Sequence, residues 1–268
     1  MTAPFGSRLA DAVAARGPLC VGIDPHPPLL AQWGLPDSPD GLARFTDAVV
    51  DALAGSVAVL KPQAAFYERH GSRGLAVLED GVARARAAGA LVLLDAKRGD
   101  IGSTMDAYAD YLRPDHPLAV DAMTVSPYLG PGSLQPAVDT AREHGGGLFV
   151  LVRTSNPEAG ALQLVGEPSV AQRVADAVRG WNDETPTGSF GVVVGATLAE
   201  LDVDLDGLGG PVLAPGLGAQ GGSPDDVRRL FGTATTVLPS VSRDVLAAGP
   251  DPAALRSAAD RWAEALAG

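Results

Sequence analysis

Hydrophobic residues in this chain gather in short continuous runs, separated by longer segments in which apolar and polar residues alternate at helical spacing. A continuous apolar run of this length predicts a strand that is buried on both faces. The predicted strands span residues 19–24, 57–61, 91–94, 119–125, 148–152, 190–194, 212–214 and 235–241. The predicted helices span residues 6–16, 42–53, 75–88, 132–143, 170–181 and 224–231, with others from about 103, around Leu198 and from 252.

This alternation predicts the fold class. Buried strands that alternate with helices indicate an α/β protein with a parallel sheet covered on both faces. Eight such units in 268 residues favour a closed (β/α)8 TIM barrel with an extra N-terminal helix over an open doubly wound sheet. No linker marks a second domain, so residues 1–268 are expected to form one barrel domain. The Pro-rich segment 25–30 is predicted to be a loop, and segment 201–210 is expected to include an exposed acidic loop.

The overall charge limits the partners. A net charge of -12 and an isoelectric point near 4.6 argue against nucleic acid or an anionic membrane as the main partner. An anionic small molecule is still compatible if positive charge is concentrated locally. The N-terminus lacks the apolar core of a secretory signal, and no apolar run reaches the ~18 residues of a spanning helix. We therefore expect a cytoplasmic protein.

Cysteine and histidine give no sign of a metal site. The single cysteine, Cys20, lies in an apolar run and is interpreted as a small core residue. The four histidines lack the spacing of metal ligands. No pyridoxal-phosphate or thiamine signature is evident, so neither a metal nor a cofactor is expected.

The polar residues at the predicted strand ends are the candidate site, because active sites of such barrels lie at the C-terminal ends of the strands. The chain has eighteen arginines but only two lysines, and both lysines, Lys61 and Lys97, stand at strand ends. There a compact ammonium that can give up a proton differs most from guanidinium. The other candidates are Asp24, Asp95, Ser155, Gln220 and Arg243.

Charged residues are concentrated in the segment LVLLDAKRGDIGST, residues 91–104, directly after its apolar run. Asp95 and Lys97 are two residues apart at a predicted strand end, so both side chains are expected on the same face. Opposite charges ~4 Å apart attract by roughly 4 kcal/mol at an effective dielectric of 20. A functional charge pair and a purely structural ion pair both fit this pattern.

Two further segments suggest an anion site. The glycine-rich loop APGLGAQGGSPDD follows the seventh predicted strand and leads into a helix at Ser223 and Pro224, while PSVSRD follows the eighth. Barrels commonly bind phosphate with these two loops, using backbone N–H groups and a helix N-terminus. Arg243 would add a bidentate charge and Gln220 an amide.

Together these motifs resemble the orotidine 5'-monophosphate decarboxylase family, in its longer-chain bacterial branch. PGLGAQGG and VSR are similar to that family's phosphate-binding segments, and the resemblance extends from Asp24 to Arg243. It implies decarboxylation of orotidine 5'-monophosphate to uridine 5'-monophosphate and CO2, without a cofactor, in de novo pyrimidine nucleotide biosynthesis. The pattern D-x-K-x-x-D-I-x-x-T is formed by Asp95, Lys97, Asp100, Ile101 and Thr104.

The resemblance also implies roles for single residues. Lys97 would protonate C6 of the pyrimidine, and Asp95 would lie beside the substrate carboxylate. The implied catalytic set is Lys97, Asp95, Lys61 and Asp100. The implied substrate-binding set is Asp24, Lys61, Ile101, Thr104, Ser155, Pro215, Gln220, Ser242 and Arg243.

Three of these residues imply an assembly. Asp100, Ile101 and Thr104 resemble residues that the family gives to the neighbouring subunit's site, so a homodimer with shared active sites is implied. Two alternatives stay open: a related metal-dependent sugar-phosphate decarboxylase or aldolase, which shares the D-x-K-x-x-D core, and a non-catalytic nucleotide-binding barrel. The sequence assigns no role to Thr124, Ser126 or Tyr128, and leaves open the contacts of the loop 154–170.

Overall fold

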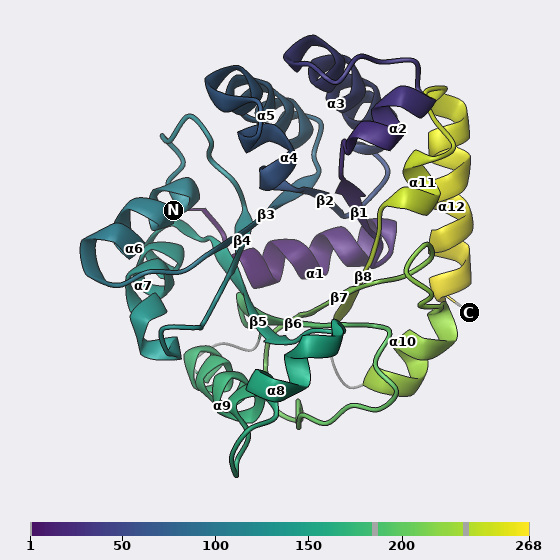
Figure 1. The fold of residues 1–268 in the computed structure, drawn as a ribbon. Coiled ribbons are helices and arrows are strands. Elements are labelled where there is room, and N and C mark those ends of the chain that lie inside the picture. Colours follow the sequence, from purple (N-terminus) through teal and green to yellow (C-terminus); the bar gives the residue numbers. More distant parts are fainter. Residues whose placement is uncertain (1, 184–186, 233–235, 268) are drawn as a thin grey trace.

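The computed structural model describes residues 2–183, 187–232 and 236–267 and forms a closed barrel of eight parallel strands (Figure 1). Each strand pairs with the next in chain order, and β8 pairs with β1 to close the ring. The predicted (β/α)8 barrel is therefore confirmed. The strands are β1 Cys20–Ile23, β2 Val59–Pro62, β3 Leu91–Arg98, β4 Ala122–Val125, β5 Gly147–Arg153, β6 Phe190–Val194, β7 Val212–Pro215 and β8 Val237–Val241.

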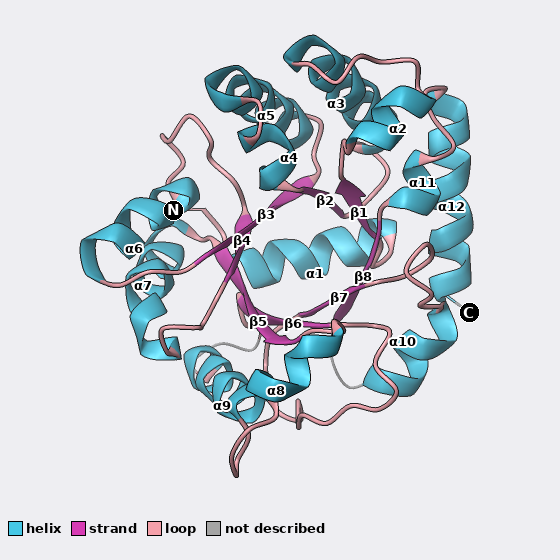
Figure 2. Cartoon of the chain, in the orientation of Figure 1, coloured by secondary structure: helices cyan, strands magenta, loops and turns pink. Residues whose placement is uncertain are grey.

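Helices surround the barrel and bury the outer faces of the strands (Figure 2). The α-helices are α1 Phe5–Arg16, α2 Pro27–Gln32, α3 Pro39–Leu53, α4 Ala64–Glu68, α5 Gly71–Ala87, α6 Gly102–Ala109, α7 Gln135–His144, α8 Gly160–Gln163, α9 Val170–Asn182, α10 Pro224–Phe231, α11 Arg243–Leu246 and α12 Pro252–Ala267. The 3-10 helices are η1 Asp110–Leu112, η2 Pro131–Leu134 and η3 Pro157–Ala159. No helix within the described ranges is long and apolar enough to cross a membrane.

The N-terminal helix α1 closes one end of the barrel, and in Figure 1 it lies across the ring of strands. Phe5 packs edge to face against Phe149 of β5, with 6.0 Å between ring centroids. A Cβ atom at Gly147 would lie 2.3 Å from the Phe5 ring, so only glycine permits this approach. Arg8 anchors the helix through Asp121 and the carbonyl oxygen of Gly145. The N-terminal end is thus plugged, which leaves the opposite end for a ligand.

The barrel interior is filled by apolar side chains from all eight strands, among them Val59, Leu93, Val193 and Leu238. Cys20 belongs to this cluster, and burial raises the pKa of its thiol to about 12. A thiol that stays protonated is a poor nucleophile. The interpretation of Cys20 as a small core residue is therefore confirmed.

Several predicted elements differ from the structure. Segment 25–30 is not a loop throughout, because Pro27 begins helix α2, whose first turn is capped by His26 Nδ1 accepting from the N–H of Leu29. Proline suits the first helical position because its missing N–H has no partner there. The helix predicted around Leu198 is wrong: the residues between β6 and β7 form turns and an irregular acidic segment.

The remaining differences concern element boundaries. The fourth strand begins at Ala122 instead of 119, and the predicted helix 132–143 begins as the 3-10 helix η2 before α7. β8 begins at Val237, and Thr235, the first residue of the strand predicted there, lies outside the described residues.

Candidate active site

A pocket opens at the C-terminal ends of the strands and collects most of the predicted site residues. Its wall carries three cations and two carboxylates, so it is locally positive in a chain of net charge -12. This is the local concentration of positive charge that an anionic ligand requires. The predicted residues that line it are Asp24, Lys61, Asp95, Lys97, Pro215, Gln220, Ser242 and Arg243.

Asp95 is the centre of the polar network. Its Oδ2 accepts hydrogen bonds from Lys61 Nζ at 2.8 Å and from Gln63 Nε2 at 3.1 Å. Its Oδ1 accepts from Lys97 Nζ at 2.5 Å and from Thr124 Oγ1 at 2.9 Å. Four donors fill the acceptor capacity of an ionised carboxylate, which fixes its plane. Asp95 therefore holds both lysines of the chain in one array.

The charges of the array keep the buried groups ionised. Burial alone would raise the pKa of the Asp95 carboxyl, but the ammonium groups of Lys61 and Lys97 outweigh it and hold that pKa well below its usual range. Burial alone would lower the pKa of Lys61, but the carboxylates of Asp95 and Asp24 raise it above its ordinary value. Lys61 is buried, whereas the Lys97 side chain is 46% exposed and reaches into the open pocket.

The end of β3 departs from a regular strand. Asp95 and Lys97 do face the same pocket, as predicted, but the β3–β4 register shifts between Leu94 and Arg98. Lys97 has a φ of 48°, in the left-handed region. The shared direction of the two side chains therefore comes from a bulge and not from simple strand alternation.

The opposite side of the pocket is built by the loops after β7 and β8. Hydrogen bonds from Gly218 N to Gly222 O and from Gly222 N to Gly216 O close the first loop on itself. Gly218 has a φ of 70°, and a Cβ there would lie 2.3 Å from Asp244 Oδ2, so glycine lets this loop pack against the start of α11. Gln220 and Arg243 consequently line one wall.

The start of α10 does not belong to this wall. Ser223 and Asp226 form a capping box that satisfies the first turn of the helix, and neither Ser223 nor Pro224 lines the pocket. The helix N-terminus that was expected at the anion site therefore lies outside the pocket lining. This wall is lined instead by Gly216, Leu217, Ala219 and Gln220 of the loop after β7 and by Ser242 and Arg243 after β8.

Two buried oxygens in the pocket wall have no hydrogen-bond partner among the residues described. They are Asp24 Oδ1, directly after β1, and Ser242 Oγ, directly after β8. Buried polar atoms are rarely left unpaired, so each is an attachment point for a polar ligand group.

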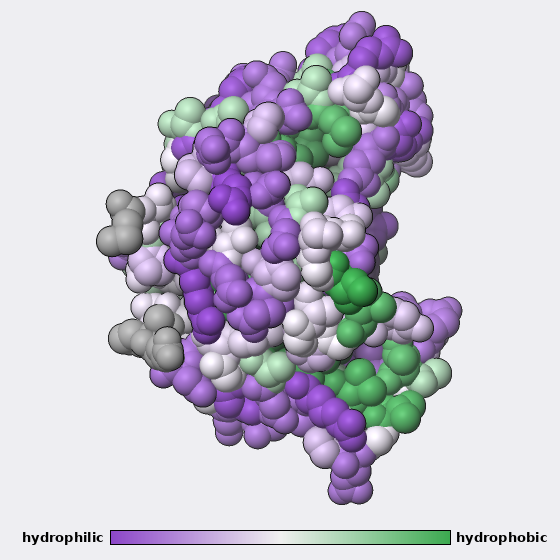
Figure 3. All heavy atoms as spheres, turned by 90° about the vertical axis from the view of Figure 1, so that its left-hand side faces the viewer, coloured by the Kyte–Doolittle hydropathy of each residue, from purple (hydrophilic) through white to green (hydrophobic). Residues whose placement is uncertain are grey.

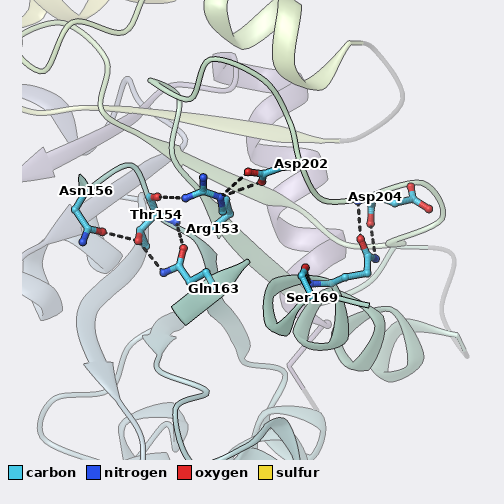
Figure 4. Close-up of polar contacts among 8 residues, drawn as sticks. Arg153, Thr154, Asn156, Gln163, Ser169, Asp202 and Asp204 are labelled. Atoms are coloured by element: carbon cyan, nitrogen blue, oxygen red, sulfur yellow. Dashed lines mark hydrogen bonds and ion pairs between the residues drawn. The ribbon is translucent and has the colours of Figure 1, made fainter. Parts of the chain in front are cut away.

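Ser155 lies outside the pocket lining and is exposed, packed against Gly195. Its loop is folded by Gln163, which accepts from Thr154 N at 2.9 Å and donates to Thr154 Oγ1 at 2.8 Å (Figure 4). The neighbouring Arg153 donates from Nε to both carboxylate oxygens of Asp202, which ties this loop to the segment before β7. The contacts of this loop were not predictable from sequence.

The other three predicted residues outside the pocket lie after β3. Asp100 accepts from the N–H of Ile101 at 2.8 Å, and Ile101 is 63% exposed. Thr104 is exposed on the first turns of α6. A single chain does not bring them to its own pocket.

Sequence reasoning also missed residues that line the pocket. Gln63 stands two residues beyond Lys61, a spacing that could have identified it as a partner on the same face. Thr124 lies inside β4, where nothing in the sequence distinguishes it from a core threonine. The others are Leu151, Val193, Leu213, Gly216, Leu217, Ala219 and Ser240. Among residues 2–183, 187–232 and 236–267, no three His, Cys, Asp or Glu side chains come together as metal ligands.

A family model and the curated relatives point to the same protein family. Residues 17–258 match the model of the orotidine 5'-phosphate decarboxylase / HUMPS family. An orotidine 5'-phosphate decarboxylase of Salinispora arenicola is 61% identical over 96% of this chain and 95% of its own length. One from Streptomyces coelicolor is 60% identical over 97% and 96%.

Solved structures of the same family are similar to this chain in fold and sequence. A Streptomyces avermitilis crystal structure, provisionally described as an orotidine 5'-phosphate decarboxylase, superposes with a TM-score of 0.95 at 60% identity, over 99% of this chain and 95% of that one. The Leishmania donovani OMP decarboxylase structure gives a TM-score of 0.73 at 30% identity, over 98% of each chain. The resemblance found in the sequence is confirmed, and the chain belongs to the orotidine 5'-phosphate decarboxylase / HUMPS family.

Proposed function

We propose that this protein is an orotidine 5'-phosphate decarboxylase, which converts orotidine 5'-monophosphate to uridine 5'-monophosphate and CO2 in pyrimidine biosynthesis, as one barrel domain of residues 1–268. One observation carries the proposal: Asp95 is held between the two lysines of the chain, and Lys97 reaches into a pocket whose opposite wall carries Arg243. The relatives near 60% identity support the same reaction.

The chemistry calls for fixed positive charge. Loss of CO2 from C6 of orotate leaves an electron pair in the ring plane, where it cannot delocalise into the π-system. The Lys97 ammonium would stabilise this carbanion and then donate its proton to C6, and a preorganised charge does this without reorganisation at the moment of reaction. Its contact with Asp95 keeps the ammonium aimed into the pocket.

Asp95 serves as the fixed counter-charge. Because it already accepts four hydrogen bonds, it has no free acceptor site and cannot easily turn away from an arriving carboxylate. A substrate carboxylate next to it is repelled, and the repulsion ends when CO2 leaves. Lys61 offsets the charge of Asp95 from the buried side.

Binding energy would come from the remote parts of the nucleotide. The unpaired Asp24 Oδ1 suits a ribose hydroxyl, and Arg243 with Gln220 suits the phosphate and the base edge. Ser242 Oγ offers a further hydrogen bond, and Pro215 forms part of the same wall. Such contacts hold the base against Lys97 and raise the rate through orientation.

The direct test is to add orotidine 5'-monophosphate to the purified protein and follow ultraviolet absorbance, with uridine 5'-monophosphate and CO2 measured as products. We expect one CO2 for each product nucleotide, with the rate unchanged by a strong chelator. Loss of turnover with the chelator would favour the metal-dependent sugar-phosphate alternative. Tight nucleotide binding without turnover would favour a non-catalytic barrel.

We also propose that two copies share their sites. Exposed apolar residues stand on the loops after β3 and β4, namely Ile101, Tyr128 and Leu129. Figure 3 shows hydrophobic patches beside a hollow at the right-hand edge of this side of the molecule. In a dimer through this face, Asp100, Ile101 and Thr104 would reach the partner's pocket.

The cytoplasmic location predicted from sequence stays a prediction.

Complementation tests this sharing. The Lys97→Ala and Asp100→Ala variants would each be inactive, and mixing them should restore part of the activity, since some dimers then hold one intact site. A mixture as inactive as its components, at a concentration where both are dimeric, would contradict a shared site.

A further inference from the structure

The two strands that carry the central charges are not in simple register. Leu94 of β3 pairs with Met123 of β4, and Arg98 pairs with Val125. Three residues of β3 therefore stand opposite a single residue of β4, Thr124. The extra length leaves the sheet as a bulge, and a bulge re-aims the side chains it carries.

Lys97 lies in this bulge with an unusual backbone conformation. Its φ of 48° is the only positive φ of a non-glycine residue among the described residues. A non-glycine residue held in this region is strained, and it persists there only when its surroundings fix it. The side chain alone is a weak anchor, because it is half-exposed on a flexible four-carbon stem.

Thr124 supplies the missing anchor. Its Oγ1 accepts a hydrogen bond from the backbone N–H of Lys97 at 2.9 Å and donates to Asp95 Oδ1 at 2.9 Å. Its residue exposure is 1%, so neither bond competes with water. A hydroxyl both accepts and donates, which is what this position between an amide and a carboxylate requires.

We propose that Thr124 is a positioning residue for the decarboxylation step: its hydroxyl joins the Lys97 backbone to the Asp95 carboxylate and so holds the Lys97 ammonium in its reactive place. This inference rests on the proposed function. It assigns Thr124 to the reacting end of the substrate and leaves the phosphate wall around Arg243 unaffected.

The test compares three variants with the wild-type chain. Thr124→Val keeps the shape but removes the hydroxyl, and Thr124→Ser keeps the hydroxyl. Thr46→Val is the matched control, because Thr46 is equally buried, and its hydroxyl bonds Leu42 O and Tyr67 outside the pocket. For each, kcat for orotidine 5'-monophosphate, the Kd of uridine 5'-monophosphate and the melting temperature are measured.

Thr124→Val should lower kcat by about 10²-fold, the size expected when a reacting group is displaced by about 1 Å. The Kd of this variant for the product should stay within about threefold of the wild-type value. The substitution leaves the phosphate wall around Arg243 unaffected, and contacts there bind the ground state and the transition state equally. Thr124→Ser should recover most of the lost kcat, and Thr46→Val should lose stability without losing kcat.

Three results would overturn the inference: near-normal kcat in Thr124→Val, a Thr124→Ser variant as slow as Thr124→Val, or equal losses in kcat and product affinity. The third would indicate a merely structural residue. An inactive wild-type chain would refute the proposed decarboxylase function itself, which is a separate and recognisable outcome.

Discussion

The Asp95 carboxylate is the most informative group to perturb, because the structure fixes every partner it has. Asp95→Asn keeps the shape but removes the charge that faces Lys61 and Lys97. Breaking a buried ion pair by removing one partner costs about 3–5 kcal/mol. Only the Lys61 pair is buried, since Lys97 is half-exposed and screened. We therefore expect a loss of about 3 kcal/mol in the free energy of unfolding at neutral pH.

The same variant has a predicted pH dependence. The pKa of Asp95 is lowered in the folded chain, so its stabilisation is complete above the ordinary aspartate pKa of about 3.9 and is lost as pH falls from there toward the folded-state pKa. The stability difference between wild type and Asp95→Asn should thus be constant from neutral pH to about pH 4 and shrink below it. Urea denaturation across this range measures it.

The matched control is Asp37→Asn. Asp37 forms a two-bond pair with Arg69, but both side chains are more than one-third exposed, and such pairs contribute about 0–1 kcal/mol. If Asp95→Asn destabilises the protein no more than Asp37→Asn does, the charge array is not the buried network inferred here.

Two further changes test other parts of the site. Arg243→Ala should weaken the binding of uridine 5'-monophosphate by about tenfold or more, because one charge-assisted hydrogen bond is lost. Calorimetry should show that the affinity for uridine, which lacks the phosphate, stays constant. An unchanged affinity for the nucleotide would refute the phosphate assignment. Gly99→Ala should lower both kcat and stability, because its Cβ would lie 2.4 Å from Ser126 O and displace the end of β3. Gly132→Ala is the control and should lower neither, because a Cβ there meets open space. Thermal melts and turnover assays distinguish the two variants.

Most of the barrel was predictable because its strands are buried on both faces and therefore appear as continuous apolar runs. The wrong assignments have local causes. Pro27 and Pro28 suggested a loop, although a proline at the first helical position starts α2. The segment around Leu198 has apolar residues without a helix, because Leu198, Val203 and Leu205 each turn separately into the core.

The site was predictable where it depends on strand ends. Lys61, Asp95 and Lys97 follow from the rule that strand ends form the pocket, and Gln63 could have been added from its spacing. Thr124 could not, because its role depends on a register shift between two strands that no local pattern encodes. Asp100, Ile101 and Thr104 lie outside the pocket of their own chain, so the geometry of one chain does not test their proposed role.

The central claim is that the Lys97 ammonium performs the chemistry while the rest of the pocket holds the nucleotide. Its most direct test is Lys97→Ala, assayed by the absorbance change of orotidine 5'-monophosphate alongside the Kd of uridine 5'-monophosphate. We expect turnover to be abolished while the product still binds within about tenfold of wild type, since Arg243, Gln220 and Asp24 are untouched. Near-normal turnover in this variant would contradict the account.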